Sequence, residues 1–352
     1  EISCSLVGSE MCIRDRYMKL YKKGIACFFA FAIMLVFFMG NSDTIYAEEI
    51  KTSDLYNKYI TVEGKNMRIV MYGNMNENGT NFADMTKTTL VMLPALGVPS
   101  PHLYFKPLAQ SLEQDFNIVI VEPFGYGLSD LAETDRTVPN INREINAALE
   151  ILGIRECVLL THSISGVYGL EFMQTYPEKV KGFIAIDNTV YDKELADAIA
   201  MEKEYMLKGI DEFQELRKFF PSIEEFQLEL ERNPEKYGAA LPEITGYTYS
   251  ESDKSEYVKA YSLSSNETIR NEVNNMDQNL LSIKGEKFPT ALPVLTMISS
   301  ENVENIPAWK SGHENQLDFS SGNHQLYVVE GGHYIWYTNL TQIVQHKCES
   351  IS

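Results

Sequence analysis

Ser163 lies within residues 158–172, VLLTHSISGVYGLEF, between an apolar run and a segment with helical spacing. A serine hydroxyl can attack an acyl carbon when a tight strand-to-helix turn holds its oxygen clear of the backbone and near amide donors. Such a turn needs small residues two positions before and two positions after the serine, and Thr161 and Ser165 occupy those positions. Small polar residues also cap helices, but the buried strand before Ser163 and the helix after it favour a nucleophile.

A serine nucleophile needs a base at neutral pH, and His333 has the sequence context of one. In folds that present a serine on such a turn, the histidine follows the last strand, late in the chain. The segment VVEGGHYIWYT places His333 after an apolar run and two glycines. A histidine at a strand end often has only a structural role, but order and context here predict a base. His162, which directly precedes the serine, is expected to pack sideways.

Two carboxylates are candidates for the acid that orients the imidazole and stabilises its charged form. The commoner position is the loop after residues 293–299, where Glu301 could serve if the loop bends suitably, whereas Asn302 carries no charge. The alternative is Asp187, at the carboxyl end of a predicted strand, which faces the crevice where α/β proteins bind ligands. We favour Asp187 over Glu301, and a helix-cap role is the competing interpretation of Asp187.

The oxyanion that forms during acyl transfer needs two backbone N–H donors. One is expected from Ile164, directly after the nucleophile. The other is expected from Leu96, in the loop LPALGVPSP that follows an apolar run. The competing interpretation of this loop is a plain strand-to-helix connection.

The candidate site residues can meet only if a sheet brings the ends of their strands together. The sequence has the pattern of such a sheet, because apolar runs alternate with segments of helical spacing. Continuous apolar runs of this kind imply a mostly parallel sheet covered by helices on both faces, here with a hairpin first. Residues 188–289 break the rhythm as a polar, acidic, helical insertion between core segments 48–187 and 290–352. The predicted strands are residues 58–64, 67–73, 88–93, 117–123, 157–161, 182–188, 293–299 and 324–333, and the predicted helices are residues 102–116, 141–153, 165–177 and 335–349.

Residues 18–47 have the pattern of a secretory signal: a basic segment, the apolar run 24–40 and polar residues ending at Ala47. That run is shorter than the ~20 residues of a membrane span, and an uncleaved N-terminal anchor is the alternative. We therefore expect a protein that is secreted or attached to the outer face of a bacterial cytoplasmic membrane. Residues 1–17 fit nothing downstream and resemble a translated adaptor fragment, so we treat them as a non-native leader.

The formal net charge of −19 argues against nucleic acid and anionic lipid as partners, which leaves a small molecule as the expected partner. Cys157 and Cys348 are the cysteines after residue 47, and two distant cysteines do not make a disulfide scaffold. Paired cysteines and an HExxH pattern are both missing from the sequence. We therefore expect no metal and no cofactor.

With these motifs in place, the chain resembles the α/β-hydrolase superfamily from about Tyr59 to the C-terminus, apart from the insertion. The resemblance is carried by LPALG, EPFGYGLSD, THSISG, FIAIDNTV and GGHYIW. It is closest to exported or anchored bacterial members with an acid after the sixth strand, which implies Ser163 as nucleophile, His333 as base and Asp187 as acid. It also implies that the insertion is a cap that closes over the site. Thr161 and Ser165 depart from the usual glycines, and Pro94 and Ala95 replace the usual His-Gly.

The main hypothesis is therefore a serine hydrolase that acts through an acyl-enzyme on small carboxylic esters. The same triad could serve a peptidase, a lactonase, a carbon–carbon bond hydrolase or an acyl transferase. A non-catalytic ligand-binding protein on the same scaffold is the alternative from another class. Haloalkane dehalogenases and epoxide hydrolases place an aspartate where Ser163 stands, so these two reactions are disfavoured.

Overall fold

The computed structural model describes residues 56–76, 82–84 and 86–350. The predicted leader (1–17) and the predicted signal or anchor (18–47) lie outside these residues. Within them, no helix combines the length and the apolar character that crossing a membrane requires.

An eight-stranded sheet in the order β1-β2-β4-β3-β5-β6-β7-β8 forms the centre of the fold. The first two strands make the predicted hairpin, and β2 runs antiparallel to both of its neighbours. All pairs among the remaining strands are parallel. The strands are β1 (Tyr56–Val62), β2 (Lys65–Tyr72), β3 (Thr89–Leu93), β4 (Asn117–Val121), β5 (Cys157–His162), β6 (Val180–Ile186), β7 (Val294–Ser299) and β8 (His324–Val329).

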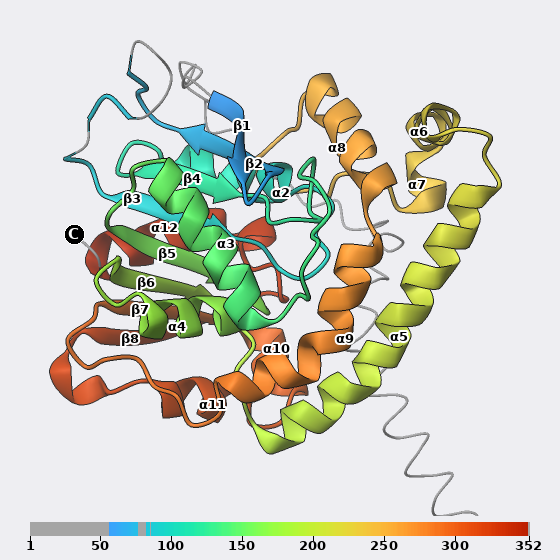
Figure 1. The fold of residues 1–352 in the computed structure, drawn as a ribbon. Helices are drawn as coiled ribbons and strands as arrows, with labels where there is room; N and C mark the ends of the chain where they lie inside the picture. The colour runs from blue at the N-terminus through green and yellow to red at the C-terminus, as the bar shows by residue number, and fades with distance from the viewer. Residues whose placement is uncertain (1–55, 77–81, 85, 351–352) are drawn as a thin grey trace, which may run out of the picture.

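Two apolar layers cover the sheet, because side chains alternate between the faces of each strand. On β3, for example, Val91 and Leu93 face one layer, whereas Leu90 and Met92 face the other. The first layer includes α3 (Val138–Ile151) and α4 (Ser165–Thr175), and the second includes α2 (Pro101–Leu112) and α12 (Trp336–Ser350). Figure 1 shows α3 and α4 in front of the sheet. The prediction of a mostly parallel sheet flanked by helices is confirmed.

Five helices lie between β6 and β7, where the sequence predicts a helical insertion at residues 188–289. In Figure 1 they lie together beside the sheet. The short helices that follow β7 lead to β8. The inserted helices are α5 (Lys193–Lys218), α6 (Ile223–Arg232), α7 (Pro234–Tyr237), α8 (Glu251–Leu263) and α9 (Glu267–Ser282), and the short ones are α10 (Ser300–Asn305), α11 (Trp309–Gln316) and the 3-10 helix η2 (Phe319–Ser321).

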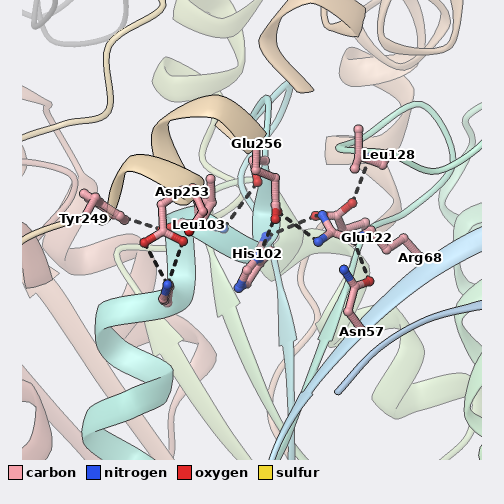
Figure 2. Close-up of polar contacts among 12 residues, drawn as sticks. Asn57, Arg68, His102, Leu103, Glu122, Leu128, Tyr249, Asp253 and Glu256 are labelled. Carbon is pink, nitrogen blue, oxygen red and sulfur yellow. Dashed lines mark hydrogen bonds and ion pairs between the residues drawn. The ribbon is translucent and has the colours of Figure 1, made fainter. Parts of the chain in front are cut away.

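Charged and polar side chains join α8 to β2 and α2 of the core (Figure 2). Glu256 on α8 accepts hydrogen bonds from Arg68 Nη2 at 2.9 Å and from His102 Nδ1 at 2.8 Å. Burial by itself raises the pKa of Glu256, but the hydrogen bond and charge of His102, together with Arg68, outweigh burial and lower this pKa to about 2. Arg68 also pairs with Glu122, whose carboxylate occupies the space beside Gly127. Helix α8 of the insertion is therefore attached to the core through the hydrogen bonds that Glu256 accepts from Arg68 and His102.

Candidate active site

Ser163 occupies a strained turn between β5 and α4. Its φ angle is 59°, in the left-handed region that is costly for a residue with a Cβ. The carbonyl of Ser163 accepts hydrogen bonds from the amide of Gly166 at 3.0 Å and from the amide of Thr189 at 2.9 Å. These bonds hold the turn against α4 and against the segment that follows β6. The structure therefore places Ser163 at the sharp strand-to-helix turn that the sequence predicts.

Asp187 and His333 contact each other across 146 positions of the chain. Nδ1 of His333 lies 2.7 Å from Oδ2 of Asp187. Glu301, the alternative acid, is exposed at the start of α10, and its amide donates to the carbonyl of Gly331. Of these two candidate acids, Asp187 is the one that lies within hydrogen-bonding distance of Nδ1.

The carboxylate of Asp187 is fully buried and accepts hydrogen bonds beyond the one from His333. The amide of Ser299 and Nε1 of Trp309 each lie 2.8 Å from Oδ1, and Nδ2 of Asn302 lies 2.6 Å from Oδ2. Burial raises the pKa of Asp187, but the hydrogen bond and charge of His333 and the amide of Ser299 outweigh burial, so this pKa lies below its ordinary value. The carboxylate of Asp187 is therefore ionised at neutral pH.

His162 packs beside His333 rather than facing solvent. The two ring centroids are 4.4 Å apart, and Nε2 of His162 lies 2.8 Å from the backbone oxygen of His333. Because a carbonyl oxygen only accepts, Nε2 of His162 carries the proton, and Nδ1 accepts from the Tyr104 hydroxyl. Burial, assisted by the charge of His333, holds the pKa of His162 well below its ordinary value. This imidazole is therefore a neutral neighbour of the predicted base.

The two predicted oxyanion donors lie on adjacent strand ends. Ile164 is the N-cap of α4 and is buried. Leu96 lies in the loop after β3, and β3 pairs with β5 up to the register of Leu93 with Thr161. The amide of Gly97 donates to the hydroxyl of Tyr126 at 3.3 Å, which anchors this loop. The role of Ile164 and Leu96 as donors stays a prediction.

Sequence reasoning missed several residues that contact the pair formed by Asp187 and His333. Asn302 lies in the loop after β7 and is uncharged, so its residue type does not indicate a role as the acid, yet its amide contacts both members of the pair. Trp309, which donates to Asp187, gave no signal because the two residues are distant in sequence. The same holds for Tyr104, whose hydroxyl contacts the neighbouring His162. Glu202 on α5 is also close enough that the charge of His333 affects it, although burial is the larger effect and raises the pKa of Glu202.

No group of three or more His, Cys, Asp or Glu residues in the described part of the chain is arranged to hold a metal ion.

A family model described as alpha/beta hydrolase fold matches residues 88–293. Among curated proteins, the chain is 28% identical over 129 residues to a protein of Bacillus subtilis (strain 168) named YbdG. It is 30% identical over 110 residues to 2-(acetamidomethylene)succinate hydrolase of Mesorhizobium japonicum. The two matches cover 36% and 31% of this chain and only 36% and 40% of the relatives' own lengths.

Two solved structures have the same fold at low sequence identity. The Cif epoxide hydrolase from Acinetobacter nosocomialis superposes with a TM-score of 0.60 at 13% identity, covering 86% of this chain and 91% of that one. The epoxide hydrolase CorEH superposes with a TM-score of 0.58 at 16% identity, covering 84% and 98% of the two chains. At these identities the likeness concerns the fold.

Proposed function

We propose that this chain, which belongs to the α/β-hydrolase fold family, is a serine hydrolase that cleaves small carboxylic esters through an acyl-enzyme. The observation that carries the proposal is the 2.7 Å contact between Asp187 Oδ2 and His333 Nδ1. The strained turn of Ser163 supports it, because the amide of Thr189, two residues after Asp187, donates to the carbonyl of Ser163. The named epoxide hydrolases share the fold, but this chain has a serine at the position where the resemblance expects their aspartate.

The proposed reaction begins when Oγ of Ser163 attacks the acyl carbon of the ester. An O–C bond forms, the hydroxyl proton passes to Nε2 of His333, and the carbonyl oxygen becomes an oxyanion bound by the amides of Ile164 and Leu96. Collapse of this intermediate breaks the C–O bond to the alcohol, which takes the proton from His333. Water then attacks the acyl-enzyme and gives a proton to His333. That proton returns to Oγ of Ser163 as the carboxylic acid leaves.

Asp187 prepares His333 for both proton transfers. An ionised carboxylate at Nδ1 keeps a proton on that nitrogen, which leaves the lone pair of Nε2 to act as the base. It also stabilises the imidazolium that forms during each step. The hydrogen bonds from Ser299, Trp309 and Asn302 to Asp187 support this role, because they favour its charged form.

The helical insertion is proposed as a cap over this site. Supporting this, Glu202 on α5 is close enough to His333 for the two groups to interact electrostatically. Small esters fit the proposal because the site residues are largely buried: Ser163 is 5% exposed and His333 is 6% exposed. Substrate choice then depends on the helices of the insertion rather than on the catalytic groups.

The proposal is tested with a fluorophosphonate probe and with p-nitrophenyl butyrate as substrate. The purified full chain is expected to be labelled at Ser163 and to release p-nitrophenol. The variant Ser163→Ala should do neither, while its circular dichroism matches that of the parent. Ser311→Ala, a serine on α11 that bonds the carbonyl of Ala308, is the control and should retain full activity. Undiminished turnover in Ser163→Ala, or a folded parent that is never labelled, refutes the assignment.

A further inference from the structure

The side chains on either side of Ser163 are buried and hydrogen-bonded. Thr161 and Ser165 flank the nucleophile at the two positions where glycine is more usual, and both are less than 2% exposed. His162, between Thr161 and the nucleophile, is also fully buried. Each of these three side chains contacts a different segment of the chain, and each of those segments carries one part of the proposed site.

Ser165 connects the turn to the end of β3. Its hydroxyl lies 2.8 Å from the carbonyl oxygen of Leu93 and accepts a hydrogen bond from the amide of His162 at 2.9 Å. A hydroxyl has one proton to donate, and the carbonyl of His162 at 2.9 Å is its other possible acceptor. Leu93 is the last residue of β3, three positions before Leu96. Donation to Leu93, the shorter of the two contacts, ties the turn of Ser163 to the loop that carries the second predicted oxyanion donor.

Thr161 connects the turn to the segment that carries the acid. Its Oγ1 accepts a hydrogen bond from Nδ2 of Asn188 at 2.8 Å, and Asn188 directly follows Asp187. Two glycines of α4 leave room for this contact. A Cβ on Gly166 would lie 2.5 Å from Cβ of Asn188, and a Cβ on Gly169 would lie 2.7 Å from Cγ2 of Thr161. A glycine at position 161 would leave room beside α4. Here Gly166 and Gly169 of α4 leave that room instead, for Asn188 and Thr161.

His162 connects the turn to the loop that carries the base. Its Nε2 donates to the backbone oxygen of His333 at 2.8 Å. The strand order makes this contact informative, because β8 is three places from β5 in the sheet. The hydrogen bonds of the sheet therefore position His333 relative to Ser163 only through two intervening strands. The contact from His162 joins the two segments directly.

We propose that Thr161, His162 and Ser165 are positioning residues, which hold Ser163 in register with the acid, the base and the oxyanion loop respectively. This inference rests on the proposed function. Its physical basis is that acyl transfer requires the reacting groups to be aligned to within a fraction of an ångström, and a displacement of about 1 Å costs on the order of 100-fold in rate. The contacts of Ser165, Thr161 and His162 join the three loops to the turn of Ser163 directly, in addition to the hydrogen bonds of the sheet.

The experiment compares variants that delete each contact with variants that keep it, using p-nitrophenyl butyrate. Thr161→Val, His162→Leu and Ser165→Ala delete the contacts, whereas Thr161→Ser and His162→Gln retain a hydroxyl and an amide donor. Activity is divided by the number of active sites that a fluorophosphonate labels, so that unfolded protein does not contribute. Each deletion is expected to lower kcat by about 10- to 100-fold, with KM changed less than about twofold. The two conservative variants should retain most of the parent's kcat.

A second measurement addresses the oxyanion loop separately. Phenylboronic acid forms a tetrahedral adduct with an active serine, which resembles the oxyanion intermediate. Ser165→Ala should bind it about 10-fold more weakly than the parent, whereas binding equal to that of the parent would contradict the role given to Ser165. If Ser165→Ala fails to fold, Ser165→Gly removes the same hydroxyl while restoring the usual residue, and it should show the same weaker binding.

Ser262→Ala is the matched control, since Ser262 is equally buried and bonds Gln227 and the carbonyl of Lys259 within the insertion. It should lower the melting temperature without changing kcat per labelled site. If the deletion variants behave like this control, the three residues are merely structural and the inference is wrong, while the proposed function stands. If the parent is neither labelled nor active, the proposed function fails and this inference fails with it.

Discussion

Asp187→Asn tests the proposed acid more sharply than any other single substitution. In the native site, the carboxylate accepts from Ser299, Trp309, Asn302 and His333, so all of its neighbours are donors. An asparagine carries one acceptor oxygen and one NH₂ group of two donors. If its oxygen faces Ser299 and Trp309, its NH₂ group meets Nδ1 of His333. The imidazole must then accept at Nδ1 and carry its proton on Nε2, which is the wrong tautomer for a base.

This change of tautomer at His333 is expected to lower kcat by about 10⁴-fold, which is the loss that the same change causes in a serine protease triad. The corresponding increase in the activation free energy is about 5 kcal/mol. The assay is hydrolysis of p-nitrophenyl butyrate at neutral pH, with circular dichroism to verify the fold. Glu301→Gln is the matched control and should change kcat by less than about twofold, because the surface position of Glu301 gives it no part in orienting the ring.

Two results would contradict this reasoning. The first is a folded Asp187→Asn variant that retains more than about a tenth of the parent's kcat, which is far above the loss expected for a wrong tautomer. The second is a loss of activity in Glu301→Gln as large as that in Asp187→Asn. That second result would move the acid to the loop after β7.

Further predictions concern stability. The pKa of Glu256 is lowered from 4.5 to about 2 in the folded state, so the contribution of its charge to the free energy of unfolding is complete above pH 4.5 and is lost as the pH falls towards 2. Urea unfolding at several pH values measures this contribution. Between pH 4.5 and pH 2, the free energy of unfolding of Glu256→Gln should fall by about 2 kcal/mol less than that of the parent. Gly127→Ala should lower the free energy of unfolding by about 3 kcal/mol, because φ is 55° and the new Cβ would lie 1.9 Å from Oε2 of Glu122; an unchanged urea midpoint would contradict this. Trp309→Phe removes a donor from the buried carboxylate of Asp187 and should lower the free energy of unfolding by about 2 kcal/mol at neutral pH. Urea unfolding followed by circular dichroism measures this change, and a stability equal to that of the parent would show that the bond contributes nothing.

The fold could be predicted from the sequence because its strands are continuous apolar runs. β3, β4, β5 and β7 are buried along their whole length, and such runs between amphipathic helices indicate a parallel sheet. The positions of Ser163 and His333 followed from chain order, since Ser163 directly follows β5 and His333 lies in the turn after β8, the last strand. Local pattern is sufficient for features of this kind.

Local pattern favoured Asp187 over Glu301 but could not exclude Glu301. Both residues follow a strand at the same edge, and what separates them is the direction in which each carboxylate points. That direction depends on the φ angle of 44° at Asp187 and on the donor Nε1 of Trp309, which is 122 positions away. A hydrogen bond between residues so distant leaves no periodic signal in the sequence. The same holds for the contact between His162 and His333.

Ser163 and Asp187 both have positive φ angles, 59° and 44°, and this shared strain has a common cause. They directly follow β5 and β6, which are neighbouring parallel strands, and each must turn back over the sheet edge for its side chain to enter the site. Each such residue costs on the order of 1–3 kcal/mol, so the turns persist only because their surroundings hold them. The amide of Asp187 donates to Met297 on β7, and the carbonyl of Ser163 accepts from Thr189. The amide of Ser163 also donates to the carbonyl of Ile186, which directly precedes Asp187. The turn of Ser163 is therefore bonded on both sides of Asp187 to the segment that carries it, and we infer that the proposed nucleophile and the proposed acid are positioned as one unit.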